Sequence, residues 1–189
     1  MTSNSRQYSF FILAVAVFAL VHEGVHAIAG AAFDEYEAFH VRPYGFEVEL
    51  KTPVADREGV KWGFISGSSN VLTILCGYMM FSARKRISAS ENAIIRRGGY
   101  YLTVLFLLSD PLNLSVGSFI YGGDIGGIVV GFGIHRWIVQ IGFFFLVLFN
   151  RELIAQRLLP AFCVETRNIA FRPWIRLKFH SLPMKPVAK

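Results

Sequence analysis

The fold of this chain is decided by residues 8–33, which read YSFFILAVAVFALVHEGVHAIAGAAF. A helix needs about 20 mostly apolar residues to cross the hydrocarbon core of a bilayer, and this stretch supplies them. Three later runs meet the same requirement, at residues 62–81, 100–121 and 127–149. The sequence therefore predicts an all-α polytopic membrane protein with four transmembrane helices.

The composition of the whole chain agrees with this class. Its 189 residues are 53% hydrophobic and 17% charged, with a mean hydropathy of +0.45. Soluble domains carry about 45–50% apolar and about 25% charged residues. The 18 Phe and the low charge exclude disorder, and 2 Cys exclude a disulfide scaffold. What remains is a small integral membrane protein.

The first apolar run also resembles a secretory signal peptide, because residues 29–31 read AGA like a cleavage site. A signal peptide has an apolar core of about 7–15 residues. The run here is longer and carries polar residues near its end. We therefore expect it to be a spanning helix.

A different pattern lies between the first two apolar runs. Within residues 36–51, apolar side chains alternate with polar ones on both sides of Pro43 and Gly45. This period of two is typical of β-strands, and the Pro and Gly indicate a turn. We therefore expect a short β-hairpin between the first two helices.

The distribution of basic residues predicts the orientation. With the N-terminus inside, 14 Lys and Arg residues fall on the cytoplasmic side and 4 on the outer side. The positive-inside rule then favours an N-in, C-in protein, which we expect in the plasma membrane. The net charge of +6 comes mostly from basic residues next to the predicted spans, where they face anionic lipid. We therefore expect the lipid bilayer, and no nucleic acid, as a partner. We divide the chain into a four-helix membrane domain, residues 1–149, and a basic cytoplasmic tail, residues 150–189.

The first apolar run contains the motif HEGVH, from His22 to His26. On a helix these two His residues share one face, where their imidazoles can chelate one Zn²⁺. Glu23 lies beside them and can act as general base toward water. Ionisable side chains are costly in a membrane and are usually functional. The alternative is a polar cluster that hydrogen-bonds neighbouring helices, or a path for protons or ions.

A catalytic zinc site needs a third protein ligand. The candidates are Asp124, in the glycine-rich residues 122–127, and Asp110, in the third apolar run. With the N-terminus inside, His22 and His26 fall in the outer half of the first helix. Asp124 lies in the outer loop and hence on the same side. The sequence therefore favours Asp124 over Asp110 as the third ligand.

Asp110 has another candidate partner. Arg136 lies inside the fourth apolar run, and the two residues fall at depths that match within a few Å at about 1.5 Å per helical residue. Charges buried in a membrane tend to pair. The sequence thus also predicts an ion pair between Asp110 and Arg136.

Together these features resemble the site-2-protease-type intramembrane zinc metallopeptidases. The resemblance rests on VHEGVHA at residues 21–27 in an apolar helix, on the hairpin-like segment after it, on a small-residue second helix and on a later Asp. It implies that His22, His26 and Asp124 hold zinc. It also implies that Glu23 activates water for cleavage of a peptide bond within or near the membrane.

The second apolar run carries SGSSN at residues 66–70. This element looks like the Gly-Pro-x-x-Asn element of the same family without its Pro. The resemblance implies that Asn70 is a catalytic residue that donates to the oxyanion. The other interpretation is that Asn70 hydrogen-bonds a neighbouring helix among small residues.

The leading hypothesis is therefore a zinc-dependent intramembrane endopeptidase that acts on membrane-protein substrates. We expect a substrate strand to add to the hairpin by β-augmentation, because a helix hides its carbonyls. Two other functions remain open. One is a metal- or proton-binding transporter or channel subunit, and the other is a non-catalytic scaffold derived from such peptidases.

Overall fold

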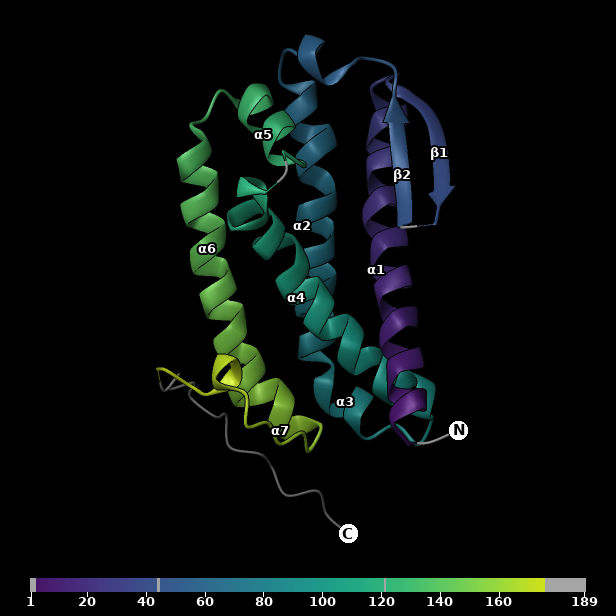
Figure 1. Ribbon diagram of the computed structural model, residues 1–189, viewed down its shortest axis with the longest axis vertical. Coiled ribbons are helices and arrows are strands. Elements are labelled where there is room, and N and C mark those ends of the chain that lie inside the picture. The colour runs from purple at the N-terminus through teal and green to yellow at the C-terminus, as the bar shows by residue number, and fades with distance from the viewer. Residues whose placement is uncertain (1–2, 44, 121, 176–189) are drawn as a thin grey trace, which may run out of the picture.

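A computed structural model of the protein describes residues 3–43, 45–120 and 122–175 (Figure 1). These residues are mostly helical, and two short strands lie beside the first helix. The four longest helices and the two strands are α1 (Ser3–Ala32), α2 (Lys61–Ser82), α4 (Gly99–Ser115), α6 (Arg136–Leu153), β1 (Tyr36–Arg42) and β2 (Gly45–Leu50). Shorter elements are η1 (Val54–Asp56), α3 (Arg84–Ser88), η2 (Ile94–Gly98), η3 (Gly117–Phe119), α5 (Ile125–Phe132), η4 (Ile154–Leu158), α7 (Leu159–Ala161) and η5 (Ile169–Phe171).

Four helices of the described residues are long and apolar enough to cross a membrane. They cover Ser5–Ala32, Lys61–Ser82, Ile94–Phe119 and Arg136–Ala161. The expected number of spans is thus confirmed on length and composition, and the arrangement fits a multi-pass membrane protein. The third predicted run ended at residue 121, which lies outside the described residues.

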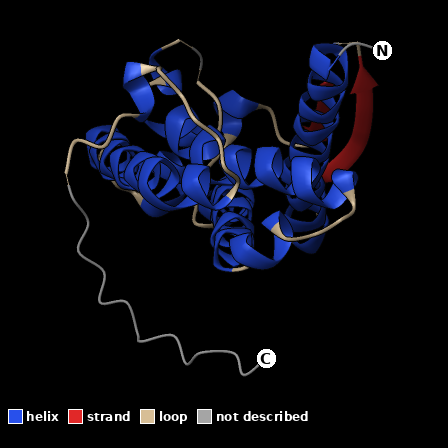
Figure 2. Ribbon diagram, turned by 90° about the horizontal axis from the view of Figure 1, so that it is seen from below, coloured by secondary structure: helices blue, strands red, loops and turns tan. Residues whose placement is uncertain are grey.

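The predicted hairpin is confirmed. Asp34 adopts a left-handed backbone (φ 59°) just after α1, a conformation that Asp tolerates better than most residues. The Glu35 amide then donates to the Gly30 carbonyl at 2.8 Å, which closes the helix and turns the chain back along it. β1 and β2 pair antiparallel, and Figure 2 shows them at the edge of the helical bundle, beside α1. A Cβ on Gly30 would lie 2.8 Å from Leu50 Cδ2, so this glycine lets β2 approach the helix.

The fourth predicted run, residues 127–149, is wrong in its boundaries. Gly133 adopts a left-handed backbone (φ 62°) and ends α5. The His135 side chain then accepts a hydrogen bond from the Trp137 amide and caps α6. The spanning helix therefore begins at Arg136, which is exposed at its first turn. α5 is a separate short helix that precedes it.

The fourth spanning helix also continues beyond residue 149. It passes through one π-helical turn, η4, into α7, so the boundary drawn at residue 150 falls within a helix. Ile154 and Leu158 are fully buried against Leu107 of α4. The first residues of the predicted tail thus pack their apolar side chains into the bundle. Residues 176–189 of the expected tail lie outside the described residues.

α5 packs unusually close to α2 because both helices carry small residues at the contact. A Cβ on Gly131 would lie 1.9 Å from the backbone nitrogen of Gly63, and one on Gly127 would lie 2.0 Å from Ser66 Oγ. Gly127 and Gly131 are four residues apart on one face of α5, the spacing that membrane helices use for close approach. This contact fixes the N-terminus of α5, and with it Asp124, against α2.

Pro111 lies inside α4 and has no backbone N–H, so the Leu107 carbonyl loses its helical donor. Asn150 of α6 supplies that donor, with its Nδ2 at 2.6 Å from the Leu107 oxygen. The Tyr78 hydroxyl of α2 donates to the Oδ1 of the same Asn at 2.6 Å. Three of the four candidate spans are thus joined through one buried amide.

Candidate metal centre

The two His residues of the HEGVH motif lie on the face of α1 that is directed into the bundle. His22 and His26 are both nearly buried, with 9% and 8% of their surface exposed. Their Nε2 atoms lie 3.1 Å apart. The i, i+4 spacing predicted this shared face, and the structure shows that both rings turn the same nitrogen toward one point.

Asp124 completes the cluster from the other side. It stands at the N-terminal cap of α5, where the close packing of α5 on α2 places it next to α1. Its Oδ2 lies 3.3 Å from His22 Nε2, and its Oδ1 lies 3.1 Å from His26 Nε2. The three residues that the sequence singled out are therefore brought together, each with one ligand atom free to face a common ion.

The geometry of the three residues fits zinc. Zinc in proteins is tetrahedral with bonds of about 2.0–2.1 Å, which places its ligand atoms about 3.3 Å apart. The two imidazole nitrogens lie 3.1 Å apart, and each lies 3.1–3.3 Å from a different oxygen of Asp124, so that the three ligand atoms fall within 4.8 Å of one another. Two imidazoles and one carboxylate also form a common donor set of catalytic zinc sites, which leave the fourth position open.

Hydrogen bonds from behind orient His26. Its Nδ1 lies 2.8 Å from the Ile65 carbonyl, which can only accept, so this nitrogen carries the proton. The Nε2 lone pair is thereby left for a metal. Ser69 Oγ lies 2.9 Å from the same Nε2.

Asp110 lies behind the other imidazole, within ion-pair distance of its Nδ1 but without the alignment of a hydrogen bond. Its Oδ1 lies 3.1 Å from His22 Nδ1, and the Thr73 hydroxyl donates to its Oδ2. A carboxylate behind a metal-binding imidazole fixes the ring orientation and raises its basicity. Asp110 is thus placed to orient a ligand, and Asp124 is placed to be one.

The predicted ion pair between Asp110 and Arg136 is wrong. Within the described residues Asp110 contacts His22 and Thr73, whereas the Arg136 guanidinium donates to the Ser118 carbonyl. The depth argument failed because Arg136 begins α6 and is not embedded in a spanning helix. The Asp110 carboxylate is instead stabilised by His22 of α1 and Thr73 of α2.

Asn70 is fully buried and lies in the same site. Its Nδ2 donates to Asp124 Oδ2 at 2.9 Å and to the Ser66 carbonyl at 2.8 Å. The amide therefore holds the candidate ligand carboxylate in place. Its Oδ1 is buried without a partner among the described residues, a cost that a purely structural Asn would avoid. This geometry favours positioning of Asp124 over the oxyanion role that the resemblance implied.

Glu23 lies at the side of the cluster. It lines a cavity of about 270 Å³ together with His22 and Asp110, between α1 and α4. Its carboxylate interacts electrostatically with both His residues, and the backbone amide of Val48 on β2 faces it. Glu23 is therefore partly exposed to a space beside the metal ligands, as a general base must be.

The carboxyl group of Asp124 lies outside the four candidate spans. Burial alone would raise its pKa, but the interactions with the neighbouring His22 and His26 side chains outweigh burial and lower the pKa well below its usual range. The group is therefore ionised at neutral pH. An ionised carboxylate is the form that binds a metal.

Sequence reasoning passed over two polar residues of α2, Ser69 and Thr73. Both are fully buried and contact the ligands or Asp110. The signal was present as a polar stripe with helical spacing on an otherwise apolar helix. That stripe consists of Ser66, Ser69, Asn70 and Thr73.

Comparison with known proteins gives no further guidance on this site. No protein-family model matches the chain, and neither a curated protein nor a solved structure is significantly similar to it. The case for a function therefore rests on the cluster of His22, His26 and Asp124 and on the groups around it.

Proposed function

We propose that the protein is a zinc-dependent intramembrane endopeptidase that cleaves membrane-protein substrates. The observation that carries this proposal is the convergence of His22, His26 and Asp124, whose ligand atoms lie within 4.8 Å of one another. Glu23 on the same helix lines the adjoining cavity. A metal held by two His and an acid, beside a free carboxylate, is the arrangement of hydrolytic zinc enzymes.

Each residue has a role in the proposed reaction. Zinc, when bound, supplies the positive charge that polarises the carbonyl of the scissile peptide bond. Glu23 accepts a proton from water as the water oxygen attacks the carbonyl carbon. The same carboxyl then donates this proton to the leaving nitrogen as the carbon–nitrogen bond breaks. Asp110 and Asn70 position His22 and Asp124.

The hairpin provides a place for an unwound substrate. β2 packs along α1, and its Val48 amide faces the Glu23 carboxylate. A substrate segment that added to the hairpin as a strand would have its carbonyls exposed near the general base. This would meet the need for an extended segment, because a helical substrate buries its peptide bonds.

We further propose the plasma membrane and an N-in, C-in orientation. The bases crowd the end of the bundle where α1 begins and α7 ends, in agreement with the positive-inside rule. Under this orientation the metal centre lies in the outer half of the membrane.

One observation favours a second candidate, a metal- or proton-translocating subunit. The polar groups continue behind the cluster, from His22 to Asp110 and on to Thr73, all buried in the bundle. Such a chain of ionisable and hydroxyl groups is typical of proton and ion paths. In that case Glu23 would serve as a binding group and not as a base.

Zinc content and the Glu23→Gln variant distinguish these functions. The peptidase predicts one zinc per purified chain, retained in Glu23→Gln, with cleavage abolished in that variant. Cleavage is measured by labelling new N-termini in membranes that contain either protein, a readout that works whichever membrane protein is cleaved. Wild-type protein without zinc, or new termini that persist in Glu23→Gln, would contradict the proposal. Zinc flux into vesicles that survives this substitution would favour translocation.

A further inference from the structure

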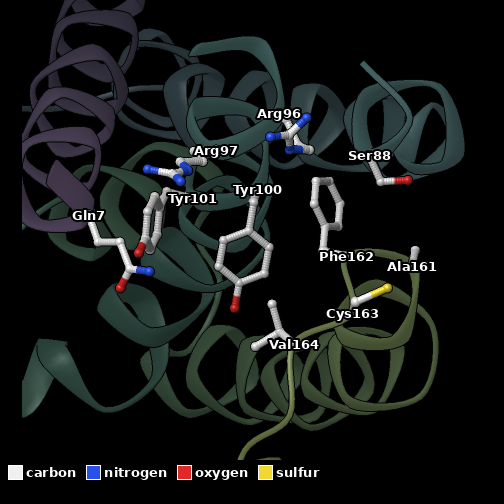
Figure 3. Close-up of a pocket in the computed structure, with 10 residues that line it drawn as sticks. All are labelled: Gln7, Ser88, Arg96, Arg97, Tyr100, Tyr101, Ala161, Phe162, Cys163 and Val164. Atoms are coloured by element: carbon white, nitrogen blue, oxygen red, sulfur yellow. The ribbon is translucent and has the colours of Figure 1, made fainter. Parts of the chain in front are cut away.

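A second cavity, of about 620 Å³, lies at the end of the bundle where the N-terminus, α3 and α7 meet (Figures 1 and 3). Gln7 of α1 lies on its wall, and His22 of the metal centre is 15 positions further along the same helix. At about 1.5 Å per residue this separation is about 22 Å. The cavity is therefore distinct from the metal centre. It is lined by Gln7, Ser88, Arg96, Arg97, Tyr100, Tyr101 and residues 161–164.

Two arginines supply the charge of this cavity. Arg96 donates to the Ser90 carbonyl at 2.6 Å, and the Arg97 guanidinium lies 5.6 Å from the ring of Phe10. Among the described residues neither guanidinium forms an ion pair with an acid. The acids nearest to the lining residues in sequence, Glu91 and Glu165, are exposed. Two half-buried guanidinium groups without a counter-charge favour an anionic ligand.

The local helix geometry places each arginine beside a tyrosine. η2 is a π-helical turn, a feature that is frequent at functional sites. Arg96 and Tyr100 are four residues apart, as are Arg97 and Tyr101, so each base shares a helix face with an aromatic ring. In Figure 3 Tyr101 lies beside Arg97, Tyr100 extends between Tyr101 and Phe162, and Arg96 lies at the top of the view.

The part of the wall that follows α7 is largely apolar and lies where three candidate spans begin or end. Phe162 and Val164 face the cavity from the chain after α7, and the Phe162 ring lies 5.3 Å from that of Tyr100. Three candidate spans begin or end here, near Ser5, Ile94 and Ala161. A cavity with cationic groups, tyrosines and apolar walls at this depth matches a phospholipid, which carries phosphate next to acyl chains.

We propose that this cavity binds the phosphate headgroup of an anionic phospholipid. Arg96 and Arg97 pair with the phosphate, since guanidinium forks match its oxygens in a bidentate manner. The acyl chains leave along the exposed apolar surface of Ile94 and Ile95, which are 62% and 52% exposed. The site is independent of the peptidase proposal.

Binding is measured on the full-length chain in detergent by native mass spectrometry. The probes are phosphatidylglycerol, phosphatidylcholine with the same acyl chains, and inorganic phosphate. We expect a single phosphatidylglycerol bound at least about tenfold more tightly than phosphatidylcholine, as charge-assisted contacts of this kind predict. Equal affinity for the two lipids would overturn the proposal. Inorganic phosphate that binds as tightly as phosphatidylglycerol would show a free anion as the ligand and would overturn the lipid assignment.

Arg97→Gln is the test variant, and Arg86→Gln is its control. Arg86 is an exposed base of α3 at the same end of the bundle and does not line the cavity. Both changes remove one charge, but only Arg97→Gln should weaken phosphatidylglycerol binding, by about tenfold or more. An equal loss in both variants would indicate general surface charge and would overturn the assigned site.

Two further measurements test the site without relying on correct folding of the Arg97→Gln variant. Ser88→Trp fills the cavity and keeps both arginines, so it should also release the lipid. Cys163 is exposed at the cavity wall, and in a Cys76→Ala background it is the only thiol left of the 2 in the chain. Phosphatidylglycerol should slow its reaction with a maleimide, whereas phosphatidylcholine should not. A labelling rate that is indifferent to the anionic lipid, or a Ser88→Trp chain that still binds it, would refute the site.

Discussion

Asp110 Oδ1 lies 3.1 Å from His22 Nδ1, on the edge of the imidazole opposite to the nitrogen that faces Asp124. The three side chains come from α4, α1 and the start of α5. The same ring is thus directed by one carboxylate and shares the candidate metal with another. Because Asp110 orients a candidate ligand and Asp124 is one, substitution of each acid should affect zinc binding to a different degree.

The two acids should differ in their effect on zinc. Asp110→Ala removes the group that orients His22, so we expect zinc affinity to fall about 10- to 100-fold. Asp124→Ala removes a ligand, so stoichiometric zinc should be lost at purification. The measurement is zinc content together with competition against a chelator, with exposed Glu165→Ala as the control. If only Asp110→Ala lost its zinc, Asp110 would be the ligand and Asp124 the positioning residue, contrary to our assignment.

Asn70→Ala distinguishes the two roles considered for this amide. Because Asn70 donates to Asp124 Oδ2 at 2.9 Å, its removal should loosen that carboxylate and lower zinc affinity, again about 10- to 100-fold. Ser82→Ala is the control, since the exposed Ser82 hydroxyl lies at the end of the same helix and donates to the Tyr78 carbonyl. Unchanged zinc affinity with lost cleavage would instead support the oxyanion role.

The hydropathy of the apolar runs was sufficient to predict the four candidate spans, and the alternation of apolar and polar residues was sufficient to predict the hairpin. Both signals are local in the sequence. The shared face of His22 and His26 followed from helical spacing for the same reason. The break at Gly133 was missed because glycine is common inside apolar membrane helices and need not end one. Only its left-handed backbone, set by packing, shows that α5 and α6 are separate.

The position of Asp110 behind His22 could not be predicted from the sequence either. A depth argument compares residues along the membrane normal and says nothing about which helices are neighbours. The contact requires α1, α2 and α4 to meet in the bundle, which is decided by side-chain packing. The polar stripe of α2 was the sequence signal that the second helix faces the site.

The close contact between α5 and α2 should make Gly131 intolerant of a side chain. A Cβ there would lie 1.9 Å from Gly63 nitrogen, so Gly131→Ala forces the helices apart, at a cost of about 1–3 kcal/mol or more. Gly126→Ala is the matched control on the same helix, because nothing lies within 4 Å of its Cβ position. Thermal unfolding in detergent should show a lower midpoint for the first variant only. Equal midpoints would contradict the assigned packing.

The contact of Glu35, which lies between α1 and β1, with the loop before α2 and the first residue of α2 should give the protein a pH-dependent stability. Lys61 Nζ lies 2.5 Å from Glu35 Oε1, and the hydrogen bonds from Lys61 and Thr52 lower the pKa of the Glu35 carboxyl. Because the folded pKa is below the ordinary value of 4.5, the stabilisation is fully present above pH 4.5 and is lost as the pH falls through the folded pKa. Unfolding midpoints measured from neutral pH to well below 4.5 should therefore fall more for wild type than for Glu35→Gln. Glu58→Gln, at an exposed acid of the same loop, should follow wild type.

Asn150 and Pro111 should be energetically coupled. Because Pro111 has no N–H, the Leu107 carbonyl depends on Asn150 Nδ2 at 2.6 Å. Asn150→Leu then leaves a buried carbonyl unpaired, at a cost of about 1–3 kcal/mol. In a Pro111→Ala background the residue at 111 regains an amide that can bond this carbonyl, so the same Asn150→Leu change should cost less. A double-mutant cycle of unfolding free energies measures the difference, which we expect to be about 1 kcal/mol. Strictly additive effects would mean that Asn150 acts through its bond to Tyr78 and not by replacing the donor that proline lacks.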